Sequence, residues 1–320
     1  MFTHKDIEFR SIIVINCIEE RSFKVQQGEL LLKDTNTGKT LTKFPFQKIL
    51  ALFIIGHATI TTPLIDKCRK YNVYIAVMKL NLRPVFTFST NAEANYLLRE
   101  KQYLQNNSSI SIARFIVNNK INNQLRLLNY TRKKDYLTTQ AIESCKLALD
   151  NIMETNNLKD LMGLEGWTAK KFFMAYYQDN DWHKRQPRMK CDEINVTLDI
   201  GYTILFNFIE TYLRMFGFDL YKGVLHQAWF KRKSLVCDLI EPFRCIIDRQ
   251  TRKSFNLNQF KKQHFKKIKN EYVLMPENNS LYYNTFYKAL IEYKVDLFKY
   301  VQRYYRYFMN NNNQFPIFDI

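Results

Sequence analysis

Carboxylate and imidazole side chains stand among apolar residues in three short segments of the chain. The first segment, Leu161–Phe173, has the apolar spacing of a helix and carries Glu165 between Gly163 and Gly166. Each glycine in a helix interior costs about 1 kcal/mol relative to alanine, so this pair indicates that something approaches the helix backbone closely. The competing interpretation is an exposed glutamate on an amphipathic helix, which composition alone favours.

The second segment, Gly223–His226, is followed by the basic stretch Lys231–Lys233. A lone histidine after an apolar pair is more often a core or capping residue than a metal ligand. On spacing alone, His183 and His264 are equally good candidates. The residues by themselves therefore leave the choice of histidine open.

The third segment, Ser234–Arg244, carries two carboxylates in apolar surroundings. Asp238 and Glu241 are three residues apart, on the same side of a helix whose first turns tolerate Pro242. Two like charges at that spacing repel each other unless a cation joins them. Carboxylates with an imidazole suit a divalent ion such as Mg²⁺ or Mn²⁺, and the lack of paired cysteines disfavours structural zinc. The three segments together support metal-assisted phosphodiester chemistry.

The balance of charge points to a polyanionic partner. The chain has 48 basic and 30 acidic residues among 320, a formal net charge of +18, and such an excess is typical of nucleic-acid-binding proteins. The alternative is a low-GC genome that encodes lysine wherever a solvated residue suffices. The sequence has neither a Walker loop nor a dinucleotide fingerprint, which argues against ATP and NAD chemistry.

Signals for secretion and for membrane insertion are missing from the sequence. It has no run of about 18 apolar residues, and its N-terminal residues lack the apolar core of a signal peptide. The six cysteines form no C-x-x-C pair, so we interpret them as buried, reduced thiols. We expect a cytoplasmic protein without membrane contact.

The spacing of apolar residues changes once along the chain, near Ala92. Roughly the first ninety residues alternate as β-strands do, and later segments have the period of helices. We expect strands at Ile12–Ile18, Ser22–Lys33, Ala51–Ile60, Val73–Met78 and Val85–Phe88, and a helix at Thr62–Tyr71. A turn is expected at residues 34–38, and loops at residues 106–109, 176–189 and 275–280. The predicted fold is α+β, with a small N-terminal β domain at residues 1–91 and a larger, all-helical C-terminal domain at residues 92–320.

Five segments of the chain resemble, in order, the motifs of the CRISPR-associated spacer-acquisition integrases, the Cas1 family. The matching residues are Arg99, Gln102 and Tyr103; Leu161–Gly166; Asp192, Asn195, Gly201 and Tyr202; Gly223–His226; and Ser234–Arg244. Two departures affect loop positions, because Glu193 and Leu220 stand where the family often has proline. The motif spacing and the Lys/Asn-rich composition are most similar to subtype V-A systems.

The resemblance implies a site and a reaction. By the matched motifs, the metal ligands are Glu165, His226 and Glu241, and Asp238 is an accessory carboxylate of the catalytic site. The ion would polarise a scissile phosphate while a 3′-hydroxyl of a short DNA fragment attacks the border of a repeat in the CRISPR array. Attack by water would give nuclease activity at the same site. Basic residues beside the ligands would hold DNA phosphates, namely Arg232, Lys233 and Arg244.

The resemblance also implies partners and leaves two alternatives. Family members form homodimers, and two dimers are bridged by the small CRISPR-associated subunit Cas2 on double-stranded DNA, the prespacer and the CRISPR repeat. We expect the β domain to supply the dimer contacts. One alternative is a stand-alone, structure-specific DNA endonuclease with the same metal site. The other is a non-enzymatic nucleic-acid scaffold with a decayed site.

Overall fold

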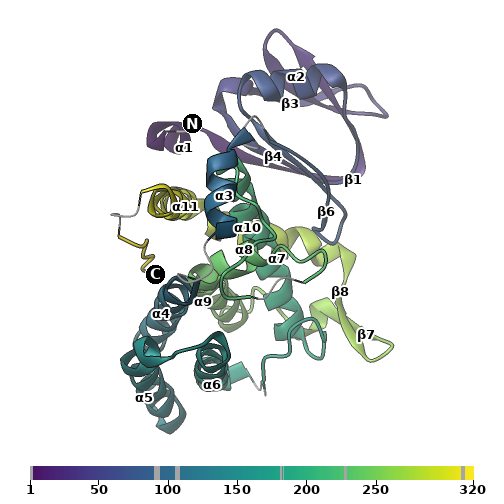
Figure 1. Cartoon of the computed structure of the whole chain (residues 1–320). Helices are drawn as coiled ribbons and strands as arrows, with labels where there is room; N and C mark the ends of the chain where they lie inside the picture. The colour runs from purple at the N-terminus through teal and green to yellow at the C-terminus, as the bar shows by residue number, and fades with distance from the viewer. Residues whose placement is uncertain are drawn as a thin grey trace. The chain divides into compact units, whose positions relative to one another are not determined.

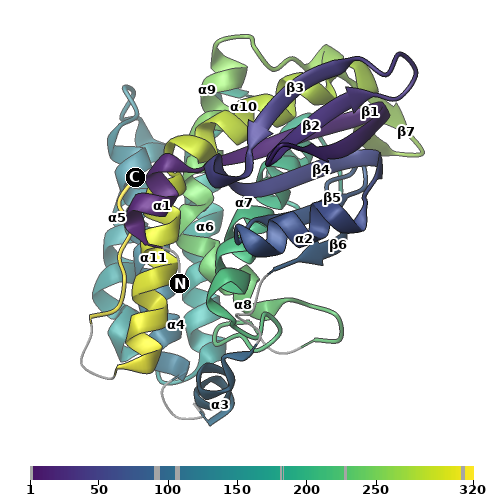
Figure 2. The same ribbon diagram turned by 90° about the horizontal axis from the view of Figure 1, so that it is seen from above.

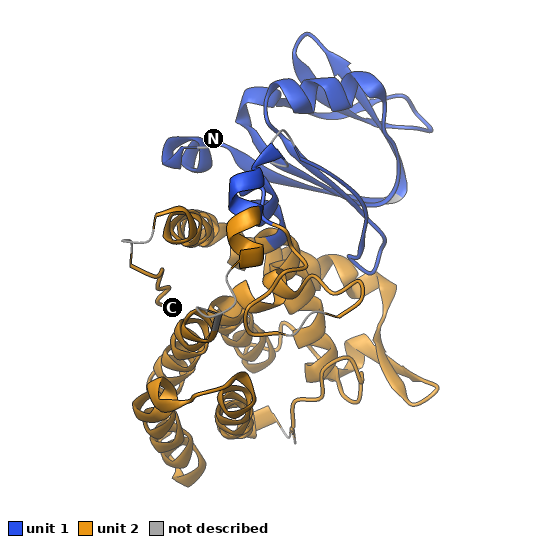
Figure 3. Cartoon of the chain, viewed as in Figure 1, with its two compact units in different colours: residues 1–99, 210–218 blue, residues 100–209, 219–320 orange. Residues whose placement is uncertain are grey.

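The computed structural model describes residues 3–89, 94–104, 109–180, 182, 184–226, 229–310 and 314–320. The chain divides into two compact units, residues 1–99 with 210–218 and residues 100–209 with 219–320 (Figure 3). The first unit contains a β-sheet and the second is mainly helical, which confirms the predicted α+β class. In the described part of the chain, no helix is long and apolar enough to cross a membrane.

The first unit is built on a six-stranded sheet in the order β3-β2-β1-β4-β5-β6. The strands are β1 (Ser11–Gln26), β2 (Glu29–Asp34), β3 (Thr40–Pro45), β4 (Ile49–Thr59), β5 (Tyr74–Met78) and β6 (Pro84–Phe88). β4 pairs in parallel with β1 and β5, and the other pairs are antiparallel. Residues 49–55 of β4 are all buried, as expected of a central strand that is covered on both faces.

One face of this sheet is covered by α2 (Thr62–Lys70), as Figure 1 shows. Leu64 and Cys68 of α2 join Ile54 and Ile75 of the sheet in one buried apolar cluster. Tyr74, the neighbour of Ile75, points to the opposite face. There its hydroxyl interacts with Thr211, in the part of α7 (Glu193–Phe216) that belongs to this unit. A short helix, α1 (His4–Phe9), precedes β1.

The chain reverses once where the sequence pattern predicts a continuous strand, within Ser22–Lys33. Gln27 and Gly28 form a tight turn with φ of 49° and 79°, so the segment is divided between β1 and β2. Glutamine is not a typical turn residue, which hides this turn in the sequence. The turn predicted at residues 34–38 is confirmed, because Gly38 N–H donates to the Asp34 carbonyl oxygen (2.9 Å) where β2 turns toward β3.

Helices make up most of the second unit (Figures 1 and 2). They are α4 (Ser109–Asn129), α5 (Tyr136–Asn151), α6 (Leu158–Tyr176), α7 up to residue 209, α8 (Ser234–Leu239), α9 (Arg244–Asn256), α10 (Asn279–Glu292) and α11 (Lys294–Met309), and α3 (Tyr96–Leu104) contains the boundary between the units. The all-helical prediction needs one correction, a hairpin of β7 (Phe265–Ile268) and β8 (Glu271–Leu274). The hairpin forms because Lys269 and Asn270 adopt φ of 48° and 66°, the conformation of a tight turn.

The predicted loops are placed as follows. In the segment 106–109, residues 106–108 lie outside the described residues, and α4 begins at Ser109. The segment 176–189 begins where α6 ends and contains a short 3₁₀ turn, Gln178–Asn180, while residues 181 and 183 lie outside the described ones. The segment 275–280 contains the 3₁₀ turn Pro276–Asn278 and the start of α10.

Candidate active site

Glu165 lies in the middle of α6, whose start and buried face follow from its sequence. Asn157 caps the helix by accepting a hydrogen bond from the backbone N–H of Asp160 (2.9 Å). Leu161 and Thr168 are buried, and Glu165 is one helical turn from each of them. Its side chain retains 23% exposure. Glu165 therefore stands on the inner side of α6 and is still accessible from outside.

Gly163 and Gly166 lie on the exposed side of α6. A Cβ atom added to either glycine would have nothing within 4 Å beyond the helix's own backbone. No described residue of this chain therefore makes the close approach that these glycines indicate. Space beside these two glycines is available to another molecule.

Asp238 of α8 fixes the loop that carries His226, residues 223–226, here called the histidine loop. Its Oδ2 accepts hydrogen bonds from the backbone N–H groups of Val224 (2.6 Å) and Leu225 (3.1 Å). Its Oδ1 accepts one from the backbone N–H of His226 (2.9 Å) and lies 2.6 Å from the ring Nδ1. Gly223 allows this approach, since a Cβ there would lie 2.7 Å from Asp238 Oδ2. The imidazole is thus oriented through Nδ1, which leaves Nε2 as the nitrogen for a ligand.

Asp238 and Glu241 do not share a cation, although they are only three residues apart. The helix that the sequence predicts across them is broken, because α8 ends at Leu239 and a 3₁₀ turn, η5 (Glu241–Phe243), follows with Pro242 at its start. Asp238 faces the histidine loop, whereas Glu241 bonds side chains of α4 and α9. The carboxylates of Asp238 and Glu241 therefore have separate hydrogen-bonding and ion-pairing partners.

Glu241 is buried between two cations. Lys120 of α4 places its Nζ 2.6 Å from Oε2, and Arg244 places Nη2 2.9 Å from Oε1. Burial by itself would raise the pKa of Glu241, but Arg244 and Lys120 outweigh it and lower the pKa to about 2. The carboxylate is therefore ionised at neutral pH.

Lys120 also bonds Glu165, so the two glutamates converge on one ammonium group. Burial lowers the pKa of Lys120, and the carboxylates of Glu165 and Glu241 outweigh that effect and raise it. His226 lies close enough to Glu241 to contribute to its lowered pKa. In the described ranges, no three His, Cys, Asp or Glu side chains are grouped as metal ligands. The donor set still fits a divalent ion, because two carboxylates meet at one positive charge and an oriented imidazole is within electrostatic reach.

The family motifs in the sequence single out the two glutamates and the histidine, but they miss Lys120. A signal was nevertheless present in the spacing of α4. Ile116 and Val117 are fully buried, and a residue three or four positions later falls on the same helix face. Lysine is almost never fully buried unless it is paired. A lysine in phase with buried apolar residues therefore indicates a buried acidic partner.

Arg244, predicted to hold a DNA phosphate, is engaged inside the protein. Besides its contact with Glu241, its guanidinium lies 4.5 Å from the centre of the Tyr202 ring. Tyr202 in turn donates a hydrogen bond to the buried carboxyl of Asp248. Burial raises the pKa of Asp248 to about 7, which the hydroxyl of Tyr202 and the nearby Arg244 only partly oppose.

The other predicted residues have varied surroundings. Arg232 and Lys233 are half-buried and directly precede α8. His264, a competing histidine by spacing, bonds the hydroxyl of Tyr282 on α10 through Nδ1 (3.1 Å). His183 lies outside the described residues.

Comparisons with known proteins identify the fold. A curated relative, "CRISPR-associated endonuclease Cas1 1" of Thermodesulfovibrio yellowstonii, is 29% identical over 238 residues, which cover 71% of this chain and 73% of that protein. The solved structure "Casposase bound to integration product" matches with a TM-score of 0.76 and 19% identity, covering 95% of this chain and 92% of that chain. A chain of the "Cas6-RT-Cas1--Cas2 complex" matches with a TM-score of 0.76 and 20% identity, covering 95% of this chain and 35% of that chain.

A β-sheet unit and a helical unit of this kind form the fold that this protein shares with the casposase and with the matched part of the chain from the Cas6-RT-Cas1--Cas2 complex. The family model "CRISPR associated protein Cas1" matches residues 17–288, a range that includes every residue of the candidate site. The chain belongs to the Cas1 family. The family resemblance of the five sequence segments is thereby confirmed.

Proposed function

We propose that this chain is a divalent-metal-dependent DNA integrase and nuclease of CRISPR adaptation, which inserts short foreign DNA fragments into the CRISPR array. The observation that carries this proposal is the convergence of Glu165 and Glu241 on one cation, together with an imidazole that Asp238 orients within electrostatic reach of Glu241. Carboxylate oxygens and a neutral imidazole nitrogen form a donor set that Mg²⁺ or Mn²⁺ accepts.

Glu165, His226 and Glu241 would hold the ion, and each is positioned by other residues of the chain. When bound, the ion supplies stabilisation of the negative charge that develops on a scissile phosphate. Asp238 keeps Nδ1 of His226 engaged, so that Nε2 presents its lone pair. Arg244 keeps Glu241 ionised and fixed in place. The open side of α6 at Gly163 and Gly166, and the 23% exposure of the Glu165 side chain, leave room for a DNA strand to reach the site.

The proposed reaction is a transesterification. A 3′-hydroxyl of a short duplex attacks a phosphate at the border of a CRISPR repeat, one phosphodiester bond forms, and the bond to the displaced 3′-oxygen breaks. Attack by water at the same phosphate gives hydrolysis, in line with the word endonuclease in the name of the relative. The net charge of +18 favours the DNA substrate, and Arg232 and Lys233 are proposed to hold its phosphates.

The proposed partners are double-stranded DNA, Cas2 and a second copy of the chain. The similarity to a chain of the Cas6-RT-Cas1--Cas2 complex supports Cas2, and the similarity to a casposase bound to an integration product supports DNA. We assign the homodimer contacts to the sheet unit. Its edge strand β6 exposes Val85 and Phe86, and exposed edge strands are ready to pair with another chain.

The test is an integration assay with the full chain. A short duplex with free 3′-hydroxyls is incubated with a supercoiled plasmid that carries a CRISPR repeat, with Cas2 and Mn²⁺ or Mg²⁺ present. We expect joined products at the repeat border that disappear when the metal is chelated. Metal-dependent cleavage without joining would favour the stand-alone endonuclease, and DNA binding with neither reaction would favour the scaffold.

A further inference from the structure

The residues 314–320, here called the C-terminal strap, are bonded to α4 by two asparagines. Asn119 Nδ2 donates to the carbonyl oxygen of Phe318 (2.7 Å), and Phe318 N–H donates back to Asn119 Oδ1 (2.9 Å). One helical turn later, Asn123 Oδ1 accepts from the N–H of Ile320 (3.1 Å), and Asn123 Nδ2 donates to the carbonyl oxygen of Phe318 (2.9 Å). Both asparagines are buried. The two amide side chains therefore pair with the strap as a neighbouring strand would.

Asn123 links the strap to the turn that carries Glu241. The same Nδ2 group that bonds Phe318 also donates to the carbonyl oxygen of Pro242 (3.0 Å). The ring of Phe318 packs on Phe243, with centroids 4.6 Å apart. The strap thus reaches both residues that follow Glu241, one through a shared amide and the other through a ring contact.

α4 holds the same turn from the position of Lys120. Lys120 lies three residues before Asn123 on the helix and bonds Glu241 Oε2 at 2.6 Å. Three contacts therefore hold η5 in place. Lys120 bonds the Glu241 carboxylate, Asn123 bonds the Pro242 carbonyl oxygen, and Phe318 of the strap packs on the ring of Phe243. None of these three contacts involves Asp238 or residues 223–226.

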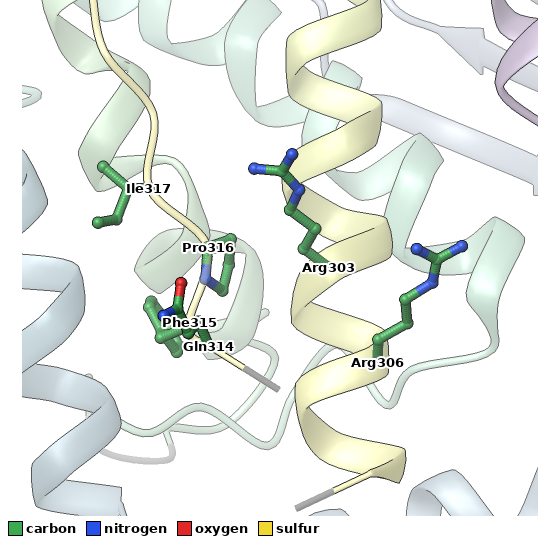
Figure 4. Close-up of a pocket in the computed structure, with 6 residues that line it drawn as sticks. All are labelled: Arg303, Arg306, Gln314, Phe315, Pro316 and Ile317. Atoms are coloured by element: carbon green, nitrogen blue, oxygen red, sulfur yellow. The ribbon is translucent and has the colours of Figure 1, made fainter. Parts of the chain in front are cut away.

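Part of the strap borders an open pocket. The pocket has a volume of about 390 Å³ and is lined by Gln314–Ile317 of the strap and by Arg303 and Arg306 of α11 (Figure 4). Ile317 lines this pocket and is 68% exposed, whereas Phe318 is buried. Phe318 is therefore packed inside the protein, whereas its neighbour Ile317 is largely exposed. Ile317 is for this reason a matched control for Phe318.

We infer that the C-terminal strap positions the metal ligand Glu241, with Phe318 and Asn123 as the positioning residues. The metal-binding part of this inference rests on the proposed function. The mechanical part, in which the strap holds the turn at residues 241–243, is independent of the proposed function. Residues 314–320 lie beyond the range that the family model matches, residues 17–288, so the inference concerns a feature of this chain outside that range.

The experiment compares four full-length variants with the unchanged chain: Phe318→Ala, Asn123→Ala, Asn119→Ala and Ile317→Ala. Two quantities are measured without DNA, the hydrogen exchange of residues 240–244 in metal-free protein and the affinity for Mn²⁺ by calorimetry. We expect Phe318→Ala and Asn123→Ala to speed exchange in this segment. We also expect them to weaken Mn²⁺ binding roughly 10-fold, the lower end of the loss seen when residues that support metal ligands are changed. Strand transfer should recover when Mn²⁺ is raised to saturation.

The control variants separate positioning from general packing. Ile317→Ala should match the unchanged chain in both quantities. Asn119→Ala removes strap bonds without touching Pro242, so its effect should be smaller than that of Asn123→Ala. Where Phe318→Ala does not fold, Phe318→Leu keeps an apolar side chain and removes the aromatic contact with Phe243. It is expected to give the same pattern with smaller changes.

Two outcomes distinguish this inference from the proposed function. The inference is overturned if the Phe318 and Asn123 variants fold and keep both the exchange rate of residues 240–244 and the Mn²⁺ affinity of the unchanged chain. The proposed metal site survives that outcome as long as the unchanged chain binds Mn²⁺. An unchanged chain that binds no Mn²⁺ would overturn the proposed metal site. Faster exchange in the variants would then still support the mechanical coupling.

Discussion

Lys120 Nζ lies 2.6 Å from Glu241 Oε2, and the same ammonium group bonds Glu165. One positive charge thus stands between the two carboxylates that are proposed to hold a divalent ion. An ammonium group and a divalent cation repel each other, so they cannot occupy the same point between these oxygens. Metal binding is therefore expected to displace Lys120 from at least one glutamate.

The first prediction concerns the replacement Lys120→Met. Removal of one partner from a buried ion pair typically costs about 3–5 kcal/mol, and here it leaves the carboxylates of Glu165 and Glu241 without their common cation. We expect the metal-free variant to lose stability of this order, and Mn²⁺ to raise its Tm more than that of the unchanged chain. Thermal unfolding with and without Mn²⁺ measures both effects. Lys170→Met, at an exposed position of α6, is the control, and equal metal-free stability of Lys120→Met and this control would refute the prediction.

The second prediction concerns the proposed ligands. Glu165→Ala, His226→Ala and Glu241→Ala should each abolish strand transfer, because a hard divalent ion loses affinity steeply when one of its few protein ligands is removed. DNA binding should remain, since lysines and arginines hold the phosphates. Filter binding and the integration assay measure the two activities separately. His264→Ala is the matched control because His264 bonds Tyr282 instead, and activity retained in His226→Ala but lost in His264→Ala would show that the wrong histidine is assigned.

The third prediction concerns the pH dependence of stability through Asp248. Burial raises the pKa of Asp248 from 3.8 to about 7. A carboxyl group with a raised folded-state pKa contributes stability that is fully present below its unfolded pKa and is lost as pH rises through the folded pKa. We therefore expect the free energy of unfolding to fall between about pH 4 and pH 7, by an amount on the order of 4 kcal/mol from this group.

The variant Asp248→Asn tests this dependence, because an amide stays neutral across that range. Its free energy of unfolding, measured with urea at several pH values, should decline less between about pH 4 and pH 7 than that of the unchanged chain. Asp150→Asn replaces an exposed aspartate of α5 and should leave the slope as it is. An equally steep decline in Asp248→Asn would remove Asp248 as the cause.

The fourth prediction concerns the glycines beside Glu165. Gly163 and Gly166 lie in a helix, and an added Cβ at either position meets nothing within 4 Å. Gly163→Ala and Gly166→Ala should therefore raise the free energy of unfolding by about 0.5–1 kcal/mol each. If DNA approaches the helix there, both variants should bind DNA more weakly in spite of their higher stability. Variants that are more stable and bind DNA as before would show that the glycines serve no close approach by DNA.

The fifth prediction concerns the salt dependence of DNA binding. The β7–β8 hairpin exposes Lys266, Lys267 and Lys269. Each phosphate contact contributes about 0.9 to the slope of log K against log salt, so replacing all three by glutamine should lower the slope by up to roughly 2.7. The charge-matched control replaces three exposed lysines of the first unit, Lys39, Lys43 and Lys48. Equal slopes for the hairpin variant and the unchanged chain would mean that these lysines only solvate the surface.

The sequence allowed prediction of those elements whose pattern is local. The apolar run at residues 49–55 has the composition of a strand covered on both faces, and α6 has its own helical period and an asparagine cap. The turn at Gln27 and Gly28 was not predictable in this way, because its positive φ angles are not encoded by a typical turn pair.

The parts of the site that depend on distant segments could not be derived from spacing. From their spacing, Asp238 and Glu241 are predicted to form one pair of like charges. In the structure they face different partners, because α8 ends at Leu239 and because Glu241 pairs with Lys120, which is 121 residues away in the chain. The bond between Asn123 and Phe318 joins residues 195 apart. Such contacts depend on how the helices pack against each other. The apolar periodicity of either segment alone does not predict them.

The division of α7 between the two units constrains how this protein can be cut or recombined. Residues 210–218 belong to the sheet unit, and there Tyr212, Leu213 and Phe216 are buried. A gene fragment that begins near residue 100 would separate the end of α7 from the sheet unit to which it belongs. Apolar side chains that lose their cover in this way would form a surface prone to aggregate. In a chimaera with a relative, the end of α7 must therefore be inherited with the sheet, although more than a hundred residues of helical unit separate them in the chain.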